Sequence, residues 1–585
     1  MEKRTNLVEY LFLRLTQLGV RSVHGVPGDY NLTILDFLEP AGLHWVGNAN
    51  ELNAGYAADG YARVKGISAL VTSFGVGELS AINAIGGAYS EKAPVVHIVG
   101  TPPTRAQTAG SCLHHSLGDG NLRVFADVYK SFTVAQANLV DAKMAPSLID
   151  EALKQCLLQS RPVYIEIPTD MVGAEISLPS KSIDLTPFGH SEPLENEAVS
   201  TLLTKMQQSQ KPLILVDGFA ARFGIRDELN ELVRLTGIPT LTTPFGKSLV
   251  DESLPNFHGV FSGLAGDPTH VAWVQSRDLV LHFGPLGSDT NTYGFTAWPN
   301  SQVTVVIEKT TVEMSDPPDA TSSSRGIYVG SFLNKIIRAL KQTFVPQHEP
   351  FPPNSGHPRE LLQALAPPVP DAKVDQYSFW LRMSHFFRPG DVLMTETGTS
   401  SYGGQSFVLP RQTTLINSCI WLSIGYMLAA SQGVALAQKD MDKEGSRPQG
   451  RTILFEGEGS IQMSAQAISD IIRNKLDIVI FVINNNGYTI ERLIHGFNAS
   501  YNDIQPWRHL EAPNYFGAPL DNEVYPVRVR RVETWGELEM ALSDPEIQEG
   551  RGLSMVEVVM AMGDAPIALA KFADYLRVRN STGSS

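Results

Sequence analysis

Two short polar segments in the last third of the chain carry residue types that can bind a metal ion and a phosphate together. Residues 457–460 (GEGS) place the carboxylate of Glu458 between two glycines, which let a ligand approach the backbone closely. Further along the chain, after a segment long enough for one helix and one strand, Asn485 supplies an amide oxygen and Gly487 a turn carbonyl. Such an all-oxygen set suits Mg²⁺, and a helix beginning near Ser460 would offer free N–H groups to an anion. The pattern therefore predicts Mg²⁺ bound to a diphosphate.

The elements around these segments form a strand–helix–strand pattern. Residues 452–456 and 478–483 are mainly apolar runs without alternation, as expected of strands buried on both faces. Between them, residues 464–476 place their isoleucines along one side of a helix. Parallel strands joined by a right-handed crossover end at the same edge of the sheet, where ligands of α/β proteins bind. An ordinary glycine turn is the alternative, and residues 484–487 (NNNG), one crossover further on, favour the binding site.

Three features nearer the amino terminus also carry possible chemistry. Glu51 follows Asn50, a typical helix N-cap residue, and by itself could be an acid that stabilises the helix dipole. Asp29 lies in a segment typical of a turn, and His114 and His115 are adjacent. Metal ligands usually occur at other spacings with cysteine or acidic partners, so this spacing does not predict a metal site at the histidines.

The composition is that of a globular chain with several domains. Of 585 residues, 43% are apolar and 18% charged, and roughly three or four domains are expected at this length. The formal net charge of −15 argues against nucleic acid or an anionic membrane as a partner. Three cysteines without paired spacing predict neither a disulfide framework nor a zinc site. The first 20 residues predict a surface helix rather than a signal peptide, and no run is long enough to span a membrane, so the cytoplasm is the expected location.

Two stretches rich in proline and polar residues, 178–197 and 345–374, predict connectors. They divide the chain into three regions, each alternating strand-like and helical runs and each expected to be a parallel-sheet α/β domain. The bounds of these domains are 1–180, 195–345 and 370–585. Other segments are expected to be solvent loops or a frayed end. The loops are 311–326 and 438–451, and the frayed end is 577–585.

Glycine–acid–glycine followed some two dozen residues later by Asn-Asn resembles the signature of thiamine diphosphate enzymes. The context GYTIERLIHG at 487–496 resembles the fungal and bacterial pyruvate decarboxylases. Other segments resemble that family in the same order along nearly the whole chain. They are HGVPGDYNLTILD (24–36), NANELNAGYAADGYAR (48–63), SCLHHSLGDG (111–120), TETGTSSYG (395–403) and IWLSIG (420–425). The resemblance implies a pyrimidine-binding domain, a Rossmann-like central domain and a diphosphate-binding domain, the first and third alike in fold.

The resemblance also implies roles for individual residues. Glu51 is expected to be catalytic, because in the family a glutamate in this setting hydrogen-bonds the aminopyrimidine ring of thiamine diphosphate. Asp29, His114, His115 and Glu491 are expected to orient a 2-oxo acid and deliver a proton. The residues expected to bind the cofactor are Glu51, Thr397, Thr399, Leu422, Ile424, Gly457, Glu458, Gly459, Ser460, Asn485 and Gly487. The expected Mg²⁺ ligands among them are Glu458, Asn485 and Gly487. The resemblance further implies a homodimer or homotetramer with each active site at a subunit interface.

The implied activity is non-oxidative decarboxylation of a 2-oxo acid, with pyruvate the expected substrate, to an aldehyde and CO₂. Some positions depart from the family pattern. Glu458 stands where Asp is usual, Leu422 where Gly is usual, and Ser401-Tyr402 where Ala-Phe is usual beside the substrate. The last two changes leave open a decarboxylase of aromatic or branched 2-oxo acids, or an acyloin-forming carboligase. Glu458 leaves open a catalytically silent structural homologue.

Overall fold

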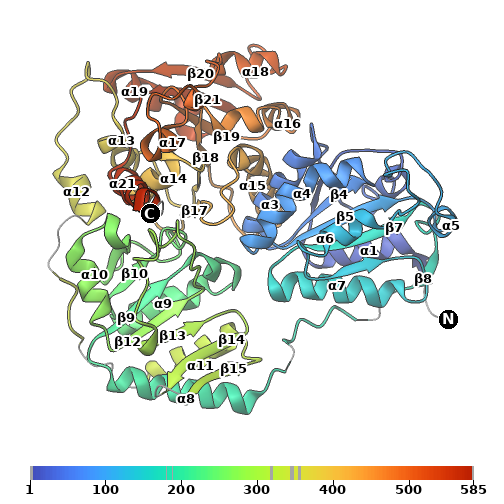
Figure 1. Cartoon of the computed structure of the whole chain (residues 1–585), viewed down its shortest axis with the longest axis horizontal. Helices are drawn as coiled ribbons and strands as arrows, with labels where there is room; N and C mark the ends of the chain where they lie inside the picture. The colour runs from blue at the N-terminus through green and yellow to red at the C-terminus, as the bar shows by residue number, and fades with distance from the viewer. Residues whose placement is uncertain are drawn as a thin grey trace.

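The computed structural model describes residues 4–178, 181–187, 189–316, 320–342, 348–352 and 357–582. Within them the chain folds around three large β-sheets, which lie in the blue, green and orange-to-red parts of Figure 1. Helices cover these sheets, and the predicted α/β class is confirmed. No helix in the described part of the chain is both long enough and apolar enough to cross a membrane.

The amino-terminal sheet has the strand order β3-β2-β4-β5-β7-β6, and its paired strands are parallel. Its inner strands, such as SALVTS of β4, are buried along their whole length, as expected of a parallel sheet covered on both faces. The strands are β2 (Ser22–Gly25), β3 (His44–Trp45), β4 (Ser68–Ser73), β5 (Val95–Thr101), β6 (Gln136–Asn138) and β7 (Val163–Pro168). The helices are α1 (Leu7–Gln17), α2 (Leu32–Leu35), α3 (Glu51–Lys65), α4 (Val76–Ser90), α5 (Thr104–Ala109), α6 (Val124–Tyr129) and α7 (Ala145–Gln159). An antiparallel ribbon pairs β1 (Arg4–Asn6) with β8 (Glu175–Ser177).

The carboxyl-terminal sheet repeats this topology. Its order is β17-β16-β18-β19-β21-β20, with parallel pairs, and counted from its own first strand this is the order of the amino-terminal sheet. The strands are β16 (Val392–Thr395), β17 (Thr414–Ile416), β18 (Thr452–Gly457), β19 (Ile478–Asn484), β20 (Val527–Val532) and β21 (Leu553–Val559). The longer helices are α13 (Gln376–Met383), α15 (Tyr426–Lys443), α16 (Ala467–Arg473), α19 (Trp535–Leu542) and α21 (Ile567–Thr582). The shorter ones are α14 (Thr399–Gly403), α17 (Thr489–Ile494), α18 (Ala512–Tyr515) and α20 (Pro545–Glu549). The first and third parts therefore share one fold, as predicted.

The central sheet is mostly parallel, with the order β11-β10-β9-β12-β13-β14-β15. The strands are β9 (Pro212–Val216), β10 (Thr240–Thr242), β11 (Phe257–Val260), β12 (Leu279–Phe283), β13 (Thr304–Ile307), β14 (Thr311–Asp316) and β15 (Ala320–Arg325). The helices are α8 (Glu192–Gln208), α9 (Arg226–Thr236), α10 (Pro268–Gln275) and α11 (Val329–Leu340). Only the β13–β14 and β14–β15 pairs are antiparallel in the described sheet.

Two segments predicted to be solvent loops contain regular structure. Within 311–326 the chain forms β14 and β15, and β14 buries Val312 and Met314 at alternate positions. The sequence interpretation missed this period of two because many serines and prolines surround it. Helix α15 continues to Lys443, so the second loop is shorter than predicted.

The predictions for the connectors and the chain ends also need correction. Helix α8 begins inside the first connector at Glu192, and the second connector contains α12 (Pro358–Ala364). The predicted surface helix, by contrast, is confirmed as α1, which begins at Leu7 and buries its apolar face. At the other end α21 extends to Thr582, where fraying was predicted. Residues 179–180, 188, 345–347, 353–356 and 583–585 of these segments lie outside the described residues.

Helices α3 and α15 join the first and third parts of the chain (Figure 1). Their backbones approach closely through small residues: a Cβ at Gly60 would overlap the Ala430 carbonyl oxygen, and one at Gly433 would overlap the Ala57 carbonyl oxygen. Any larger side chain at either glycine would push the helices apart. We name this contact the α3–α15 seam.

A buried histidine in the amino-terminal sheet predicts a loss of stability in acid. His24 of β2 is fully buried, and neither ring nitrogen has a hydrogen-bond partner among the described residues. Burial lowers the pKa of His24 from 6.5 to about 3, so the unfolded chain takes up the proton first. The stability that depends on neutral His24 is complete above pH 6.5 and is lost as pH falls towards 3, by about 2 kcal/mol between pH 7 and pH 5. We expect the His24→Gln variant to lose less stability than the wild type over this interval in urea unfolding. Equal losses would contradict this assignment.

Candidate active site

A cavity of about 240 Å³ lies at the carboxyl edge of the carboxyl-terminal sheet, where β16, β18 and β19 end. Loops after these strands form its wall, which is the usual ligand position in a parallel α/β sheet. The predicted β18–helix–β19 unit is confirmed, with the two strands paired in parallel. The predicted residues that line the cavity are Thr397, Thr399, Ile424, Gly457, Glu458, Gly459, Ser460, Asn485, Gly487 and Glu491.

Oxygen-bearing groups meet in one corner of this cavity. The Asn485 side-chain amide lies 3.3 Å from Glu458 Oε1 and 3.2 Å from the carbonyl oxygen of Gly487. With its nitrogen turned towards them, the amide donates to both oxygens; with its oxygen turned towards them, three oxygens converge as a divalent cation requires. Burial raises the pKa of Glu458, and no ion pair to this carboxylate occurs among the described residues. The corner therefore fits a divalent cation that would compensate a buried charge.

The other end of the cavity fits an anion. Ser400 Oγ is buried without a hydrogen-bond partner in the described part of the chain, and Ser400 lines the cavity. Gly459 is packed against Tyr488, where a Cβ would lie 2.7 Å from the ring. The predicted α-helix at Ser460 is instead a 3₁₀ turn, and α16 begins only at Ala467. Backbone N–H groups of this turn and the Ser400 hydroxyl from the β16 loop are therefore available in the cavity wall, which suits a phosphate.

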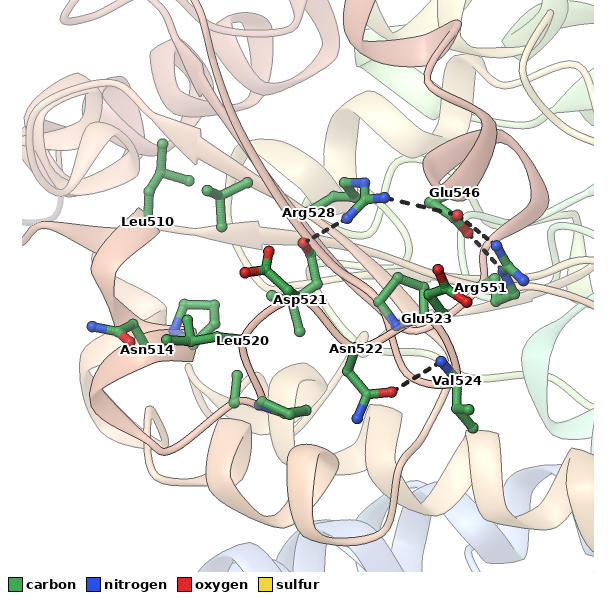
Figure 2. Close-up of a pocket in the computed structure, with 16 residues that line it drawn as sticks. Leu510, Asn514, Leu520, Asp521, Asn522, Glu523, Val524, Arg528, Glu546 and Arg551 are labelled. Atoms are coloured by element: carbon green, nitrogen blue, oxygen red, sulfur yellow. Dashed lines mark hydrogen bonds and ion pairs between the residues drawn. The ribbon is translucent and has the colours of Figure 1, made fainter.

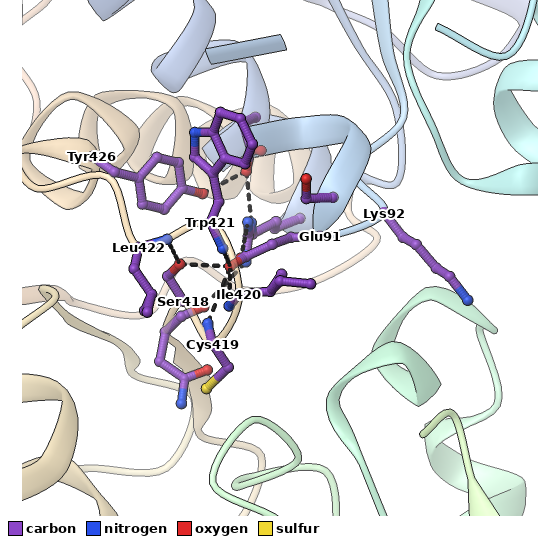
Figure 3. A network of polar contacts seen from close by, with 12 residues as sticks. Glu91, Lys92, Ser418, Cys419, Ile420, Trp421, Leu422 and Tyr426 are labelled. Atoms are coloured by element: carbon purple, nitrogen blue, oxygen red, sulfur yellow. Dashed lines mark hydrogen bonds and ion pairs between the residues drawn. The ribbon is translucent and has the colours of Figure 1, made fainter. Parts of the chain in front are cut away.

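The loop before α15 is held from the amino-terminal part of the chain. Oε1 of Glu91, the C-cap residue of α4, accepts hydrogen bonds from Ser418 Oγ at 2.5 Å and from the Cys419 N–H at 3.1 Å (Figure 3). Arg63 Nη2 donates to the other carboxylate oxygen at 2.7 Å. Burial alone would raise the pKa of Glu91, but the Arg63 charge and these hydrogen bonds hold it below its usual value. The loop is thus held by hydrogen bonds to the buried, ionised carboxylate of Glu91.

Leu422 occupies a strained position in this loop. Its φ of 54° lies in the left-handed region, which costs a residue with a Cβ about 1 kcal/mol. Asn83 of α4 fixes both neighbours: Trp421 Nε1 donates to Asn83 Oδ1 at 2.9 Å, and Asn83 Nδ2 donates to Ser423 Oγ at 3.1 Å. These contacts hold Leu422 in a conformation that glycine would adopt without strain.

Glu51 lies at the carboxyl edge of the amino-terminal sheet. It is the first residue of α3, and the predicted N-cap is confirmed because Asn50 Oδ1 accepts the Asn53 N–H at 2.8 Å. The ideal Cβ position of Gly77 lies 3.0 Å from Glu51 Oε1, so this carboxylate rests against α4. Burial raises the pKa of Glu51, because removal from water disfavours the charged carboxylate.

Asp29, His114 and His115 form a cluster at the same edge. His114 Nε2 lies 2.5 Å from Asp29 Oδ2, and one ligand-type atom from each of the three side chains lies within 4.8 Å of the others. Tyr30 stacks on His114 with ring centroids 4.9 Å apart. The structure therefore brings these three predicted residues together.

In the described part of the chain, this cavity does not include both groups of predicted residues. The wall described above is drawn from residues 397–491 alone, so Glu51 and the Asp29 cluster do not contribute to it. Leu422 also lies outside that wall. One chain thus contains both halves of the predicted site without joining them.

Comparison with family models covers all three parts of the chain. Residues 5–120 match the N-terminal TPP binding domain of thiamine pyrophosphate enzymes, residues 199–322 the central domain, and residues 396–558 the C-terminal TPP binding domain. The chain belongs to the thiamine pyrophosphate enzyme family. Thiamine pyrophosphate, the same compound as thiamine diphosphate, is its cofactor. The cation corner and the phosphate end of the cavity fit the diphosphate of this cofactor.

Curated relatives of this thiamine pyrophosphate enzyme align along nearly its whole length. The pyruvate decarboxylase of Aspergillus parasiticus is 47% identical over 569 residues, which cover 96% of this chain and 96% of the relative. The pyruvate decarboxylase of Aspergillus fumigatus is 43% identical to this chain, and the alignment covers 99% of this chain and 98% of the relative. The pyruvate decarboxylase of Candida albicans is 39% identical, and the alignment covers 97% of this chain and 98% of the relative.

Sequence reasoning missed a pair of acids directly behind the cavity of this enzyme. Glu396 and Glu456 are fully buried at the ends of β16 and β18. Glu396 accepts the N–H groups of Thr397 at 2.7 Å and Met427 at 2.9 Å, so it ties the β16 loop to the first turn of α15. Burial raises the pKa of Glu396 to about 7, and burial together with Glu396 raises that of Glu456. The signal available in the sequence was an acid at the end of each of two buried strands, Glu456 directly before Gly457 and Glu396 two residues before Gly398.

Ser401 and Tyr402, expected beside the substrate, are not part of the cavity wall. Ser401 is buried, with its N–H bonded to the Glu396 carbonyl, and Tyr402 packs against Tyr293 and Phe572. Tyr402 therefore joins the central part of the chain to α21. Its hydroxyl gives no evidence of an enlarged or more polar substrate pocket.

A larger hollow of about 940 Å³ lies around β20 and the loop before it (Figure 2). Arg528 and Arg551 in its wall both pair with Glu546, the closer contact being that of Arg551 at 2.5 Å. None of the predicted site residues lines this hollow. Both arginines of its wall are thus paired with Glu546, and we assign this hollow no role in the site.

Proposed function

We propose that this chain is a thiamine diphosphate-dependent decarboxylase that converts a 2-oxo acid, with pyruvate as main substrate, to an aldehyde and CO₂. The observation that carries the proposal is the cavity of residues 397–491, where the cation corner and the phosphate end lie beside Glu491. The relatives named pyruvate decarboxylase align over nearly the whole chain and support pyruvate as the substrate.

Two groups of this chain's residues would bind the cofactor, one through Mg²⁺ and one through the diphosphate. Glu458, Asn485 and Gly487 would hold Mg²⁺, and Thr397, Thr399 and Ser460 would surround the diphosphate. When bound, thiamine diphosphate supplies the carbon centre that bonds to the substrate and takes up the electron pair released with CO₂.

Proton transfer is assigned to the amino-terminal half of the site. The raised pKa of Glu51 lets its carboxyl group take or give a proton at the aminopyrimidine ring. Asp29, His114, His115 and, from the cavity, Glu491 orient the 2-oxo acid and provide the proton that replaces the departing carboxylate. The close contact of Asp29 with His114 supports this assignment because the carboxylate orients the imidazole ring.

We further propose that two copies complete each active site, in a homodimer or a pair of such dimers. The separation of the two groups within one chain supports this assembly. Apolar side chains are also exposed on α4 and on the loop before α15: Val76 is 55% exposed, Leu79 40% and Ile420 43%. A second copy packed against this face would cover them. The cysteines, free in the described structure, support a reducing compartment and hence the cytoplasm, which cell fractionation would test.

Release of CO₂ from a panel of 2-oxo acids tests the activity, with thiamine diphosphate and Mg²⁺ in excess. We expect pyruvate to be turned over faster than aromatic and branched acids, with acetaldehyde rather than an acyloin as product. Ser401 and Tyr402 do not line the cavity of one chain, so the Leu422 change remains the ground for the alternative substrates. Turnover of larger acids alone would establish a specialised decarboxylase. Silence with every acid would favour the structural homologue and refute the proposal.

A further inference from the structure

The Asp29 cluster has a geometry that its sequence spacing does not predict. Adjacent residues in an extended segment point to opposite sides, so His114 and His115 would normally face apart. Here His115 has a φ of 67°, in the left-handed region, and the two imidazole rings lie with centroids 4.9 Å apart at 76°. This backbone turn brings both rings to the side of Asp29, so that one ligand-type atom from each residue lies within 4.8 Å of the others.

The surrounding structure fixes this arrangement. Gly75 lies so close beneath His115 that a Cβ there would overlap the His115 carbonyl oxygen. Tyr30, only 6% exposed, stacks on His114 at an interplanar angle of 13° and meets His115 edge-on at 6.1 Å. His115 Nδ1 is buried without a hydrogen-bond partner among the described residues. The cluster thus presents a fixed set of donors, one of them unused by the protein.

We propose that Asp29, His114 and His115 bind a transition-metal cation such as Zn²⁺, at a site separate from the Mg²⁺ corner. Two imidazoles and one carboxylate are the donors that Zn²⁺ and its neighbours prefer, whereas Mg²⁺ prefers oxygen ligands. The side chains of His114 and Asp29 are 58% and 50% exposed, so a cation can reach them from solvent. One chain therefore offers two cation sites of different chemical preference.

Occupation of this site would remove catalytic groups from the reaction. A cation bound here occupies the ring nitrogens and the carboxylate oxygen of the cluster, and the cluster can then no longer protonate the product. We expect Zn²⁺ to inhibit turnover and excess Mg²⁺ not to relieve the inhibition, while a chelator selective for Zn²⁺ does. This consequence rests on the proposed function, whereas the binding itself does not.

Calorimetric titration of Zn²⁺ into protein saturated with thiamine diphosphate and Mg²⁺ tests the binding. The Cys112→Ser variant serves as the background, because Cys112 is an exposed thiol two residues before His114. We expect one Zn²⁺ per chain at the cluster, and at least about tenfold weaker binding in both Asp29→Asn and His115→Gln. The matched control, His385→Gln, changes an exposed histidine elsewhere and should leave the affinity unchanged.

A second readout uses Co²⁺, whose visible absorption becomes stronger when protein ligands replace water and lower its coordination number. We expect that absorption in the background protein and its loss in His115→Gln, with circular dichroism showing that the variant is folded. Absence of Zn²⁺ binding, affinity unchanged in both cluster variants, or displacement of Zn²⁺ by excess Mg²⁺ would each overturn the proposal. Zn²⁺ binding in a protein inactive with every 2-oxo acid would sustain the site while refuting the proposed function.

Discussion

Replacement of Glu51 by Gln lowers the rate of pyruvate decarboxylation by at least about 100-fold and leaves the fold and cofactor binding in place. Gln keeps the size of the side chain and can still hydrogen-bond, but it cannot exchange a proton. The Asn50 cap, which holds the start of α3, is untouched by the change. The measurement is kcat with pyruvate, together with thiamine diphosphate affinity from calorimetry.

A matched control separates this effect from the loss of a helix-stabilising charge. Glu192 also lies in the first turn of a helix, α8, but its side chain is 75% exposed. Glu192→Gln removes the same charge from a helix amino terminus and should leave kcat unchanged. If Glu51→Gln kept more than about a tenth of the wild-type rate, the proton-transfer role assigned to Glu51 would be wrong.

Replacement of Glu458 by Gln weakens Mg²⁺-dependent cofactor binding by at least about tenfold, because the corner loses its only carboxylate among the described residues. Glu458→Asp, which restores the usual family residue, should keep binding within a few-fold. The measurement is calorimetric titration of thiamine diphosphate at fixed Mg²⁺. Tight binding to Glu458→Gln would show that the metal is held elsewhere.

The two variants together test the proposed sharing of sites between copies. Glu51→Gln and Glu458→Gln chains are co-expressed with different tags. In a mixed dimer one site carries both changes and the other carries none. Random pairing should therefore restore about a quarter of wild-type activity. The assay uses a cofactor concentration that loads the wild type but not Glu458→Gln, so that each variant expressed alone shows little activity. Purified mixed dimers without activity would contradict a site built from two chains.

The sequence predicted those parts of the site that follow from local pattern. The β18–helix–β19 unit and the meeting of Glu458 with Asn485 are confirmed, because buried parallel strands and a single crossover leave little freedom. The Asn50 cap was predictable for the same reason: its partner lies three residues away.

What the sequence did not predict depends on contacts between distant segments. Nothing in the sequence around Glu91 indicates a role for this acid after α4. Its role follows from the hydrogen bond with Ser418, which lies more than three hundred residues later in the chain. The orientation of Tyr402 is decided by Tyr293 and Phe572, and neither is near it in sequence. The left-handed turn at His115 depends on Gly75 beneath it. Patterns within one segment contain no information about such partners.

The α3–α15 seam has a consequence for how long the enzyme keeps its cofactor. Because the two backbones are in contact at these glycines, we expect the first and third parts of one chain to move as a single body. In the proposed assembly the cofactor lies between such bodies, and it can leave only when they separate. The lifetime of the loaded enzyme is then set by the rate at which subunits exchange, and dilution should unload it faster than any competing ligand.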